Sequence, residues 1–155
     1  MPTQRLKEFL DSNKVKYVAI SHSQAFTAQE IAASAHIPGR QLAKTVMVTL
    51  GGEMAMAVLP ATDHVDLRLL KKAAGVKKAQ LADEKEFKDL FPDCEIGAMP
   101  PFGNLYDLEV YVAASLAEGE DIAFNAGSHT ELIQMAYADF ERLVKPKVVE
   151  VSLAV

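Results

Sequence analysis

The stretch FNAGSHTELIQM, residues 124–135, places the imidazole of His129 directly after a turn of small residues. The apolar residues that follow predict a buried strand, so the histidine stands at the mouth of that strand. A hairpin needs only turn formers at such a point. His129 is therefore either a loop residue without a role or part of a pocket, and the rest of the chain has to decide between the two.

Lys44 interrupts a second apolar run. The segment LAKTVMV, residues 42–48, otherwise reads as a buried strand. A lysine within such a strand has to extend its ammonium group to solvent or face a polar pocket. The spacing leaves a solvated strand end and a functional lysine as equal alternatives.

The segment IGAMPPFG, residues 96–103, is rich in glycine and proline and predicts an irregular loop. Pro100 and Pro101 stiffen it, while Gly97 and Gly103 allow backbone N–H groups to come close to a ligand. Rigid loops with exposed amides bind carbonyl groups or oxyanions. A tight connection between two elements explains the same residues equally well.

Other kinds of catalytic site find little support. Ser128 and His129 are neighbours that cannot easily face each other, and no GxSxG turn is present, which disfavours a Ser-His-Asp triad. The histidines lack the spacing of a metal site. Neither a GxGxxG motif nor a Walker loop occurs, so we expect no cofactor and no metal.

The charge balance limits the kind of nucleic-acid contact that the chain can make. A formal net charge of -5 disfavours a protein that coats DNA or RNA, because phosphate binding draws on accumulated positive charge. One cluster of basic residues stands out in this acidic chain, and it is either a solvated helix face or a local contact for phosphate groups. Its residues are Arg68, Lys71, Lys72, Lys77 and Lys78.

The elements that must position these residues alternate irregularly between strand and helix. Apolar periodicity and caps predict helices over 3–12, 27–38, 66–75, 84–90 and 138–144. Strands are expected over 15–20, 43–50, 54–60, 107–116, 120–126, 130–136 and 147–155, with Gly51 and Gly52 turning the first hairpin. This order predicts a mixed α/β fold with a sheet of about six or seven strands surrounded by helices.

The 155 residues suit one domain, 1–155, that buries roughly 70% of its unfolded surface. The single cysteine, Cys94, excludes an internal disulfide and fits a reducing compartment. The N-terminal residues read as an amphipathic helix and not as a signal peptide, and no apolar run is long enough for a membrane span. We therefore expect a soluble, cytoplasmic protein without a membrane partner.

Four segments in this order and spacing resemble the YbaK/ProX family of aminoacyl-tRNA deacylases, which is related to the editing domain inserted in bacterial prolyl-tRNA synthetases. They are LAKTVMV, LPATDHVDLRLLKKAAGVKKAQLA, IGAMPPFG and DIAFNAGSHTELIQMAYADFERL. The resemblance covers residues 22–143 and implies a central curved mixed sheet. It also implies hydrolysis of the ester that joins a wrong amino acid to the 3′ end of a tRNA, in most characterised branches the tRNA for proline.

The resemblance assigns roles to the residues that spacing left open. Lys44 is the family's signature lysine and would hold a terminal phosphate or polarise the ester; Gly127 would let the backbone approach the aminoacyl group, and His129 would position it. The expected substrate contacts are His22, Ser128 and two sets of wall residues. The loop residues Gly97, Pro101 and Gly103 would form the pocket wall opposite His129. Apolar walls are expected from Phe26, Met47, Met99 and Phe102, residue types for which packing in the core is the alternative. The cysteine-specific YbaK branch carries an acidic residue near position 129, so that specificity does not transfer directly.

The expected function is a free-standing trans-editing deacylase that removes a small or near-cognate amino acid from mischarged tRNA, with the tRNA for proline as the first candidate. Arg68, Lys71, Lys72, Lys77 and Lys78 would contact the acceptor end, and prolyl-tRNA synthetase or an elongation factor would hold the rest. Two alternatives stay open: a non-catalytic module that binds tRNA ends or aminoacylated ligands, and an unrelated hydrolase of simple amino-acid esters.

Overall fold

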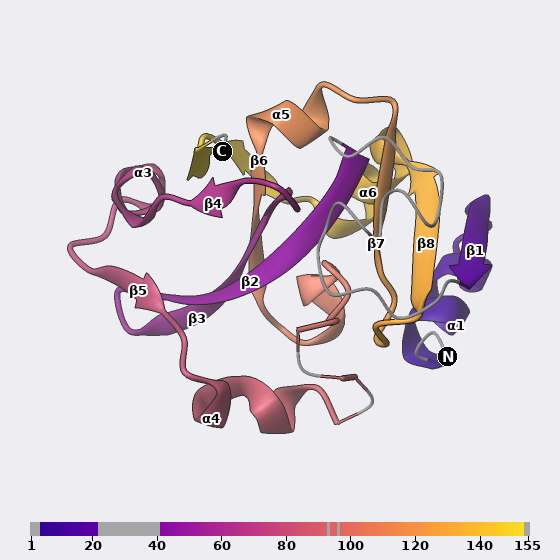
Figure 1. Cartoon of the computed structure of the whole chain (residues 1–155), viewed down its shortest axis with the longest axis horizontal. Coiled ribbons are helices and arrows are strands. Elements are labelled where there is room, and N and C mark those ends of the chain that lie inside the picture. Colours follow the sequence, from indigo (N-terminus) through magenta and orange to yellow (C-terminus); the bar gives the residue numbers. More distant parts are fainter. Residues whose placement is uncertain (1–3, 22–40, 93, 96, 154–155) are drawn as a thin grey trace.

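A computed structural model describes residues 4–21, 41–92, 94–95 and 97–153 (Figure 1). The helix expected over 27–38 and the substrate contacts expected at His22 and Phe26 lie outside these residues. No helix in the described ranges combines the length and the apolar character that crossing a membrane would require.

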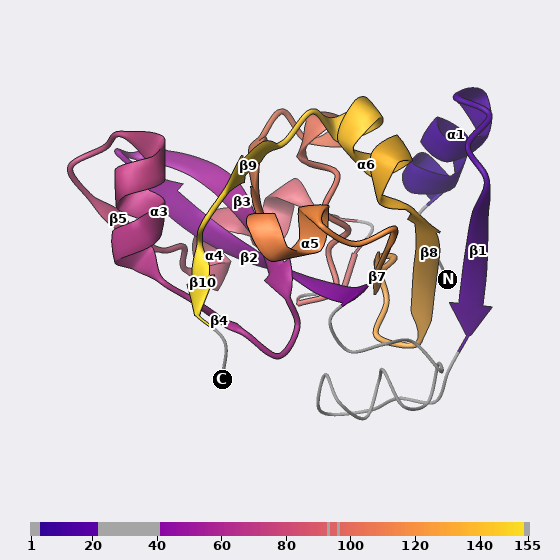
Figure 2. The same ribbon diagram turned by 90° about the horizontal axis from the view of Figure 1, so that it is seen from above.

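The centre of the molecule is a curved mixed sheet (Figures 1 and 2). Its strands are β1 (Tyr17–Ser21), β2 (Leu42–Leu50), β3 (Glu53–Pro60), β5 (Ala79–Leu81), β6 (Glu109–Ala113), β7 (Asp121–Asn125), β8 (Glu131–Ala136) and β9 (Lys147–Val149). Their order is β1-β8-β7-β2-β3-β6-β9, with β5 paired to β2. The pairs β2·β7, β3·β6 and β6·β9 are parallel and the others antiparallel. The expected mixed α/β fold with a central sheet is confirmed.

Helices cover both faces of this sheet. They are α1 (Gln4–Ser12), α3 (Leu67–Ala74), α4 (Glu84–Phe87), α5 (Ala114–Ala117) and α6 (Tyr137–Val144), with short 3-10 turns η2 (Lys88–Leu90) and η3 (Gly103–Leu105). The buried residues of α1, α4, α5 and α6 belong to one core cluster, and Leu70 of α3 belongs to another on the opposite face. The second cluster also contains Val151, beside the two-stranded pair β4 (His64–Val65) and β10 (Ser152–Leu153).

Local signals explain the elements nearest to the candidate site. Asp66 caps α3 by accepting hydrogen bonds from the backbone N–H groups of Arg68 and Leu69, at 2.9 and 3.3 Å. Gly75 ends the helix in the left-handed conformation, at φ +69°. Gly51 and Gly52 also have positive φ and turn β2 into β3. These three predicted features are confirmed.

The structure differs from the expected elements in three places. The main sheet has eight described strands because β5, only three residues long, pairs with the end of β2. The expected strand 107–116 stops at Ala113, where the chain turns into α5. The expected last strand divides into β9, which pairs with β6, and β10, which pairs with β4. Short apolar segments carry too few residues for periodicity to separate helix from strand, so tertiary pairing decides.

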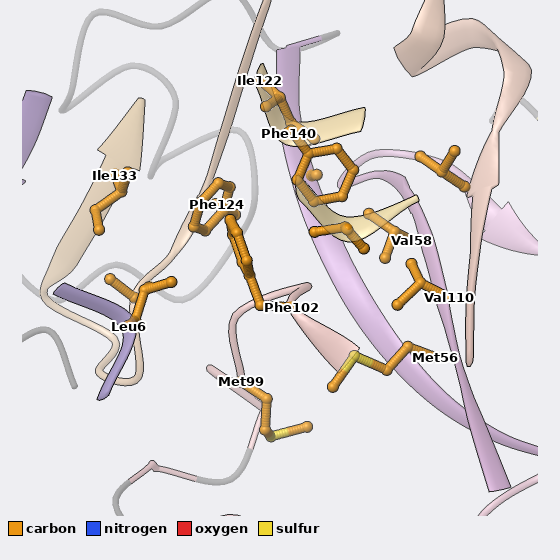
Figure 3. Packing of buried hydrophobic residues seen from close by; sticks show 14 of the residues in the cluster. Leu6, Met56, Val58, Met99, Phe102, Val110, Ile122, Phe124, Ile133 and Phe140 are labelled. Atoms are coloured by element: carbon orange, nitrogen blue, oxygen red, sulfur yellow. The ribbon is translucent and has the colours of Figure 1, made fainter. Parts of the chain in front are cut away.

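The larger core cluster packs around Phe102, which is fully buried (Figure 3). Its ring lies 5.4 Å from that of Phe124, 5.6 Å from that of Phe140 and 6.1 Å from that of Phe9. These are ordinary distances for aromatic pairs within a core. Phe102 therefore packs against β7, α6 and α1 at the same time.

Candidate functional site

Lys44 lies where two parallel strands separate. Leu42 of β2 pairs with Ala123 of β7, and Ala43 pairs with Phe124, after which the pairing stops. Figure 1 shows β2 running away from β7 beyond this point. Lys44 is the next residue along β2, and Asn125, the next along β7, is the last residue before the turn that carries His129. The pairing thus brings Lys44 to within about one strand spacing, roughly 5 Å between backbones, of the end of β7.

The side chain of Lys44 belongs to the face of the sheet that carries α3. Its cross-strand partner is Leu59, a member of the α3-side core, whereas Ala43 belongs to the opposite core. The side chain is half-buried, and burial lowers the pKa of Lys44, with the negative charge of Asp63 partly opposing this effect. The structure therefore holds a poorly solvated cation at the divergence of β2 and β7.

The turn after β7 is built around Gly127, whose φ of +98° favours glycine. Both of its backbone groups are already bonded: its N–H donates to the carbonyl of Ala98 at 2.9 Å, and its carbonyl accepts from the N–H of Glu95 at 2.8 Å. The expected approach of the Gly127 backbone to the substrate is not what this geometry offers. Gly127 instead joins the loop that precedes Pro100 to the turn that precedes His129.

Ser128 is a structural residue of the same turn. Its side chain is buried, lies 3.0 Å from the hydroxyl of Thr130, and accepts a hydrogen bond from the Thr130 N–H at 3.1 Å. This is the pattern of a serine that stabilises its own turn. The hydroxyl is directed at Thr130 and not at the neighbouring imidazole, which agrees with the absence of a triad motif.

Glu95 connects the two loops through its side chain as well. Its carboxylate accepts from the backbone N–H of His129 at 3.4 Å and lies 3.8 Å from Nε2 of the same residue. The imidazole retains 33% of its exposure, so it remains accessible while the carboxylate limits its orientation. His129 thus stands on a turn that is fixed at its backbone and at its ring.

Gly97 and His129, which sequence reasoning placed on opposite walls, touch each other. A β-carbon built on Gly97 would lie 3.4 Å from Cε1 of His129, and the φ of Gly97 is +87°. Its N–H donates to the thioether of Met99, at 3.3 Å, a weak acceptor that a carbonyl oxygen could replace. The structure therefore brings Gly97, Gly127 and His129 together, with Lys44 at the end of the adjoining strand.

Replacing Gly97 by alanine should impair activity more than stability. The positive φ costs an alanine about 1 kcal/mol, and the new methyl group fills the space beside the His129 ring, in contact with Cε1. Gly52→Ala is the matched control, because its φ is +90° and nothing lies within 4 Å of the added carbon. We expect similar losses of thermal stability in both variants and a loss of deacylation, about 10-fold, in Gly97→Ala alone. Equal activity in the two variants would remove the Gly97–His129 contact from the site.

Three expected pocket residues lie in the core instead. Met47, Met99 and Phe102 are buried members of the cluster shown in part in Figure 3. Met47 is three residues from Lys44, and side chains alternate along a strand, so the two point to opposite faces. Their burial favours core packing, the alternative left open by the sequence, and a role as pocket walls stays a prediction.

The other two residues of the expected wall are also closely packed. Pro101 is buried, and a β-carbon on Gly103 would lie 2.5 Å from the carbonyl oxygen of Leu108 and 2.6 Å from Cγ2 of Val110. Gly103 therefore allows close packing of its own chain, and its expected approach to a ligand stays a prediction.

The basic residues surround one hollow on the surface. Arg68 and Lys71 of α3, with Lys77 and Lys78 of the following loop, line a depression of about 190 Å³. Lys72 is exposed on α3 but does not line it. The hollow lies on the Lys44 face, beside the part of β2 that starts at Val48, about 13 Å along the strand from Lys44. The cluster is thus within a few nucleotides' reach of the candidate site.

A larger hollow, of about 480 Å³, has the opposite character. It is lined by Gln41, Ser115, Leu116, Glu118, Gly119, Glu120 and Asp121. Three carboxylates make it an unfavourable place for a phosphate group. A nucleic-acid ligand would find its electrostatic partner in the basic hollow and not here.

Sequence reasoning missed Glu95, Asp63 and Asn125. Glu95 directly precedes the Gly-rich loop and Asn125 directly precedes the His129 turn, which are positions that a search around both motifs would have reached. Asp63 follows β3, whose end pairs with the start of β2, so only the strand register places it near Lys44.

Comparison with known proteins agrees with the fold. The "Multifunctional Ser/Thr-tRNA deacylase ProXp-y" of Escherichia coli (strain K12) is 27% identical over 151 residues, which cover 94% of this chain and 90% of the relative. The crystal structure of hypothetical protein APE2540 has a TM-score of 0.85 at 18% identity and covers 97% of this chain and 100% of its own. A candidate trans-editing enzyme for prolyl tRNA synthetase has a TM-score of 0.83 at 19% identity, with coverage of 97% and 96%.

The expected relation to tRNA-editing proteins is confirmed by a match of the Aminoacyl-tRNA editing domain to residues 22–143. This range includes Lys44, the loop that begins at Gly97 and the turn that carries His129. The matched residues form most of the chain. The protein therefore belongs to the aminoacyl-tRNA editing domain family.

Proposed function

We propose that this protein is a trans-editing enzyme that hydrolyses the ester bond of a mischarged aminoacyl-tRNA. Membership of the editing family and relatedness to a tRNA deacylase support aminoacyl-tRNA hydrolysis as the activity. The observation that carries the proposal is the position of Lys44, a half-buried cation at the separation of β2 and β7, next to the turn that fixes His129. We place the enzyme in the cytosol, where aminoacyl-tRNA is made and used.

The reaction does not require a strong nucleophile from the protein. An aminoacyl ester is already activated, so the enzyme has to hold the carbonyl group, admit a water molecule and exclude larger acyl groups. The ammonium group of Lys44 would stabilise negative charge on the ester oxygen or hold the terminal phosphate. Water attacks the carbonyl carbon, the bond to the ribose oxygen breaks, and the amino acid and the free tRNA end are released.

His129 would position the aminoacyl group. Its ring is oriented by Glu95 and packs against Gly97, so it presents an exposed edge from a fixed place. The His129 ring and the loop around it are held in place by Gly97, Gly127 and Glu95, which is the proposed role of these three residues. His129→Ala should therefore change the rate of deacylation or the amino-acid preference. If both stay the same, His129 is a loop residue without a role in the reaction.

The finer substrate assignment is tRNA for proline that carries a small or near-cognate amino acid. Release of labelled amino acid should be measured from this tRNA charged in turn with alanine, cysteine, serine, threonine and proline. Because the relative ProXp-y is named for Ser/Thr-tRNA, serine and threonine on their own tRNAs complete the panel. Selective release that depends on Lys44 supports editing and names its target. No release from any species by folded protein would favour a non-catalytic tRNA-end binding module of the same fold.

The basic hollow is the proposed contact with the acceptor end, and its contribution should be electrostatic. Arg68→Ala and Lys71→Ala should each raise KM several-fold with little change in kcat, because they remove phosphate contacts and leave the chemistry intact. The slope of log KM against log salt should fall by about 0.7 for each lost contact to a single strand.

Lys16→Ala is the control for this prediction, since Lys16 is an exposed lysine just before β1, at the other end of the sheet from α3 (Figure 1). Equal effects of all three substitutions would mean that only net charge matters. The protein's overall charge of -5 limits the footprint, so prolyl-tRNA synthetase or an elongation factor is proposed to hold the rest of the tRNA.

A further inference from the structure

Asn125 holds a buried polar atom whose hydrogen-bonding capacity is unused. Its amide oxygen is inaccessible to solvent and accepts no hydrogen bond in the structure. Buried polar side chains are normally paired, and an unpaired one lowers stability. Such a group in a native protein calls for an explanation. A ligand that displaces the side chains covering the oxygen and supplies the missing donor is one.

The position of Asn125 connects this oxygen to the candidate site. Ala43 and Phe124 are parallel partners with side chains in the same core, so the next residues of the two strands, Lys44 and Asn125, both turn to the other face. Asn125 is also the last residue of β7, two residues before Gly127. A cationic donor and an unused acceptor thus stand next to each other where β2 and β7 separate.

The two groups are complementary to one particular piece of an aminoacyl-tRNA. The ester carbonyl is an acceptor and suits Lys44. On either side of the ester stand donors: the α-amine of the amino acid and the ribose hydroxyl next to the ester oxygen. A site that bound the carbonyl alone would have no use for an acceptor at Asn125.

We propose that Asn125 is a substrate-binding residue whose amide oxygen accepts a hydrogen bond from a donor group that flanks the ester, either the α-amine or the neighbouring ribose hydroxyl. This inference rests on the proposed function and specifies what the site recognises. It makes the enzyme selective for esters that retain the relevant donor, because a ligand without it leaves the buried oxygen unpaired. An acyl-tRNA whose acyl group has no α-amine would be rejected if the donor is the amine.

Binding of a non-hydrolysable ligand tests the inference apart from catalysis. The probe is tRNA ending in 3′-amino-3′-deoxyadenosine that carries serine through an amide. Two further probes are its 3-hydroxypropionyl form, which keeps the serine side chain and lacks the α-amine, and its form lacking the ribose 2′-hydroxyl. Wild-type protein and Asn125→Leu, which has a similar shape without the acceptor, are titrated with all three.

Asn125→Leu should bind the first probe about 10-fold or more weakly than the wild type. One of the two further probes lacks the donor that Asn125 contacts. Wild-type protein and Asn125→Leu should bind that probe equally well, and the equal binding identifies the donor. Equal binding of the first probe by both proteins, or an equal loss on all three probes, overturns the inference. Wild-type protein that fails to bind the first probe also overturns it.

Thermal unfolding separates a binding residue from a structural one. Removal of an unpaired buried oxygen should leave the Tm of Asn125→Leu unchanged or raise it. The matched control is Thr49→Val, because the hydroxyl of Thr49 is likewise buried and unpaired in the structure but lies five residues from Lys44 along β2, on the opposite face. Thr49→Val should resemble Asn125→Leu in stability and leave binding unchanged. A clear fall in the Tm of Asn125→Leu would show that Asn125 supports the fold, against the inference.

The proposed hydrolysis and the proposed role of Asn125 can be contradicted independently of each other. Donor-dependent binding of the probe without release of amino acid from any charged tRNA would contradict the proposed hydrolysis and support the assignment of Asn125. Selective release without any effect of Asn125→Leu would do the reverse.

Discussion

Lys44→Met should lower kcat/KM for deacylation by about 100-fold or more, while the protein stays folded. Loss of one group that stabilises charge developing at a reacting ester oxygen typically costs about 100- to 1000-fold. Methionine keeps the unbranched stem of lysine and removes only the charge. The measurement is release of labelled amino acid under single-turnover conditions from the best substrate of the panel. Lys16→Met, at an exposed position, should retain full activity.

The same substitution should raise stability at neutral pH. Burial lowers the pKa of Lys44 below its ordinary value of 10.5, so the folded state holds the proton less tightly than the unfolded state does. The cost of the buried charge is fully present below the folded pKa and disappears as the pH rises to 10.5. The stability gained by Lys44→Met should therefore be present at pH 7 and shrink toward pH 10.5, as followed by denaturant unfolding.

Two results would contradict this account of Lys44. Unchanged deacylation by Lys44→Met would remove the lysine from the reaction. A loss of stability at pH 7 would show that attraction to Asp63 outweighs the cost of burial, against the order of effects given above. Activity lost together with stability gained is the signature of a residue retained for function.

Phe102→Ala should have the largest effect on stability. The ring is fully buried among Phe9, Phe124 and Phe140, and truncation of such a phenylalanine usually costs about 3–5 kcal/mol of unfolding free energy. Urea unfolding monitored by circular dichroism measures the change. Leu81→Ala, at a side chain with 56% exposure, should alter stability by no more than about 0.5 kcal/mol.

This substitution also separates core from pocket. The amino-acid preference of the Phe102→Ala molecules that remain folded should be unchanged, because the ring lies on the face opposite Lys44. If Phe102→Ala loses little stability but changes the preference among alanine, serine and threonine as the released amino acid, Phe102 lines the pocket. Phe102 was expected either in the pocket wall or in the core, and its burial favours the core.

Burial also shows why apolar residues were the least predictable part of the site. Met47, Met99 and Phe102 are chemically suited either to a pocket wall or to a core, and the sequence contains no signal that separates the two roles. Lys44 was a better candidate because a charge inside an apolar strand is costly in a core, so its type alone indicates a special environment.

Local physics determined much of this protein directly from the sequence. The cap at Asp66, the left-handed Gly75 and the glycine turn between β2 and β3 each depend on residues within a few positions of one another. The alternation of apolar residues over the longer strands and the unusual position of Lys44 are equally local. The four motifs identified the family for the same reason, since they are properties of order and spacing.

Tertiary structure alone decided how these parts meet. The parallel pairing of Leu42 and Ala43 with β7 joins residues 81 positions apart and places Lys44 beside Asn125 and the His129 turn. The two hydrogen bonds of Gly127 seat the Gly97 loop against that turn, on the same side and not on the opposite wall. Such contacts depend on the register and packing of the whole sheet, which periodicity within one segment cannot encode.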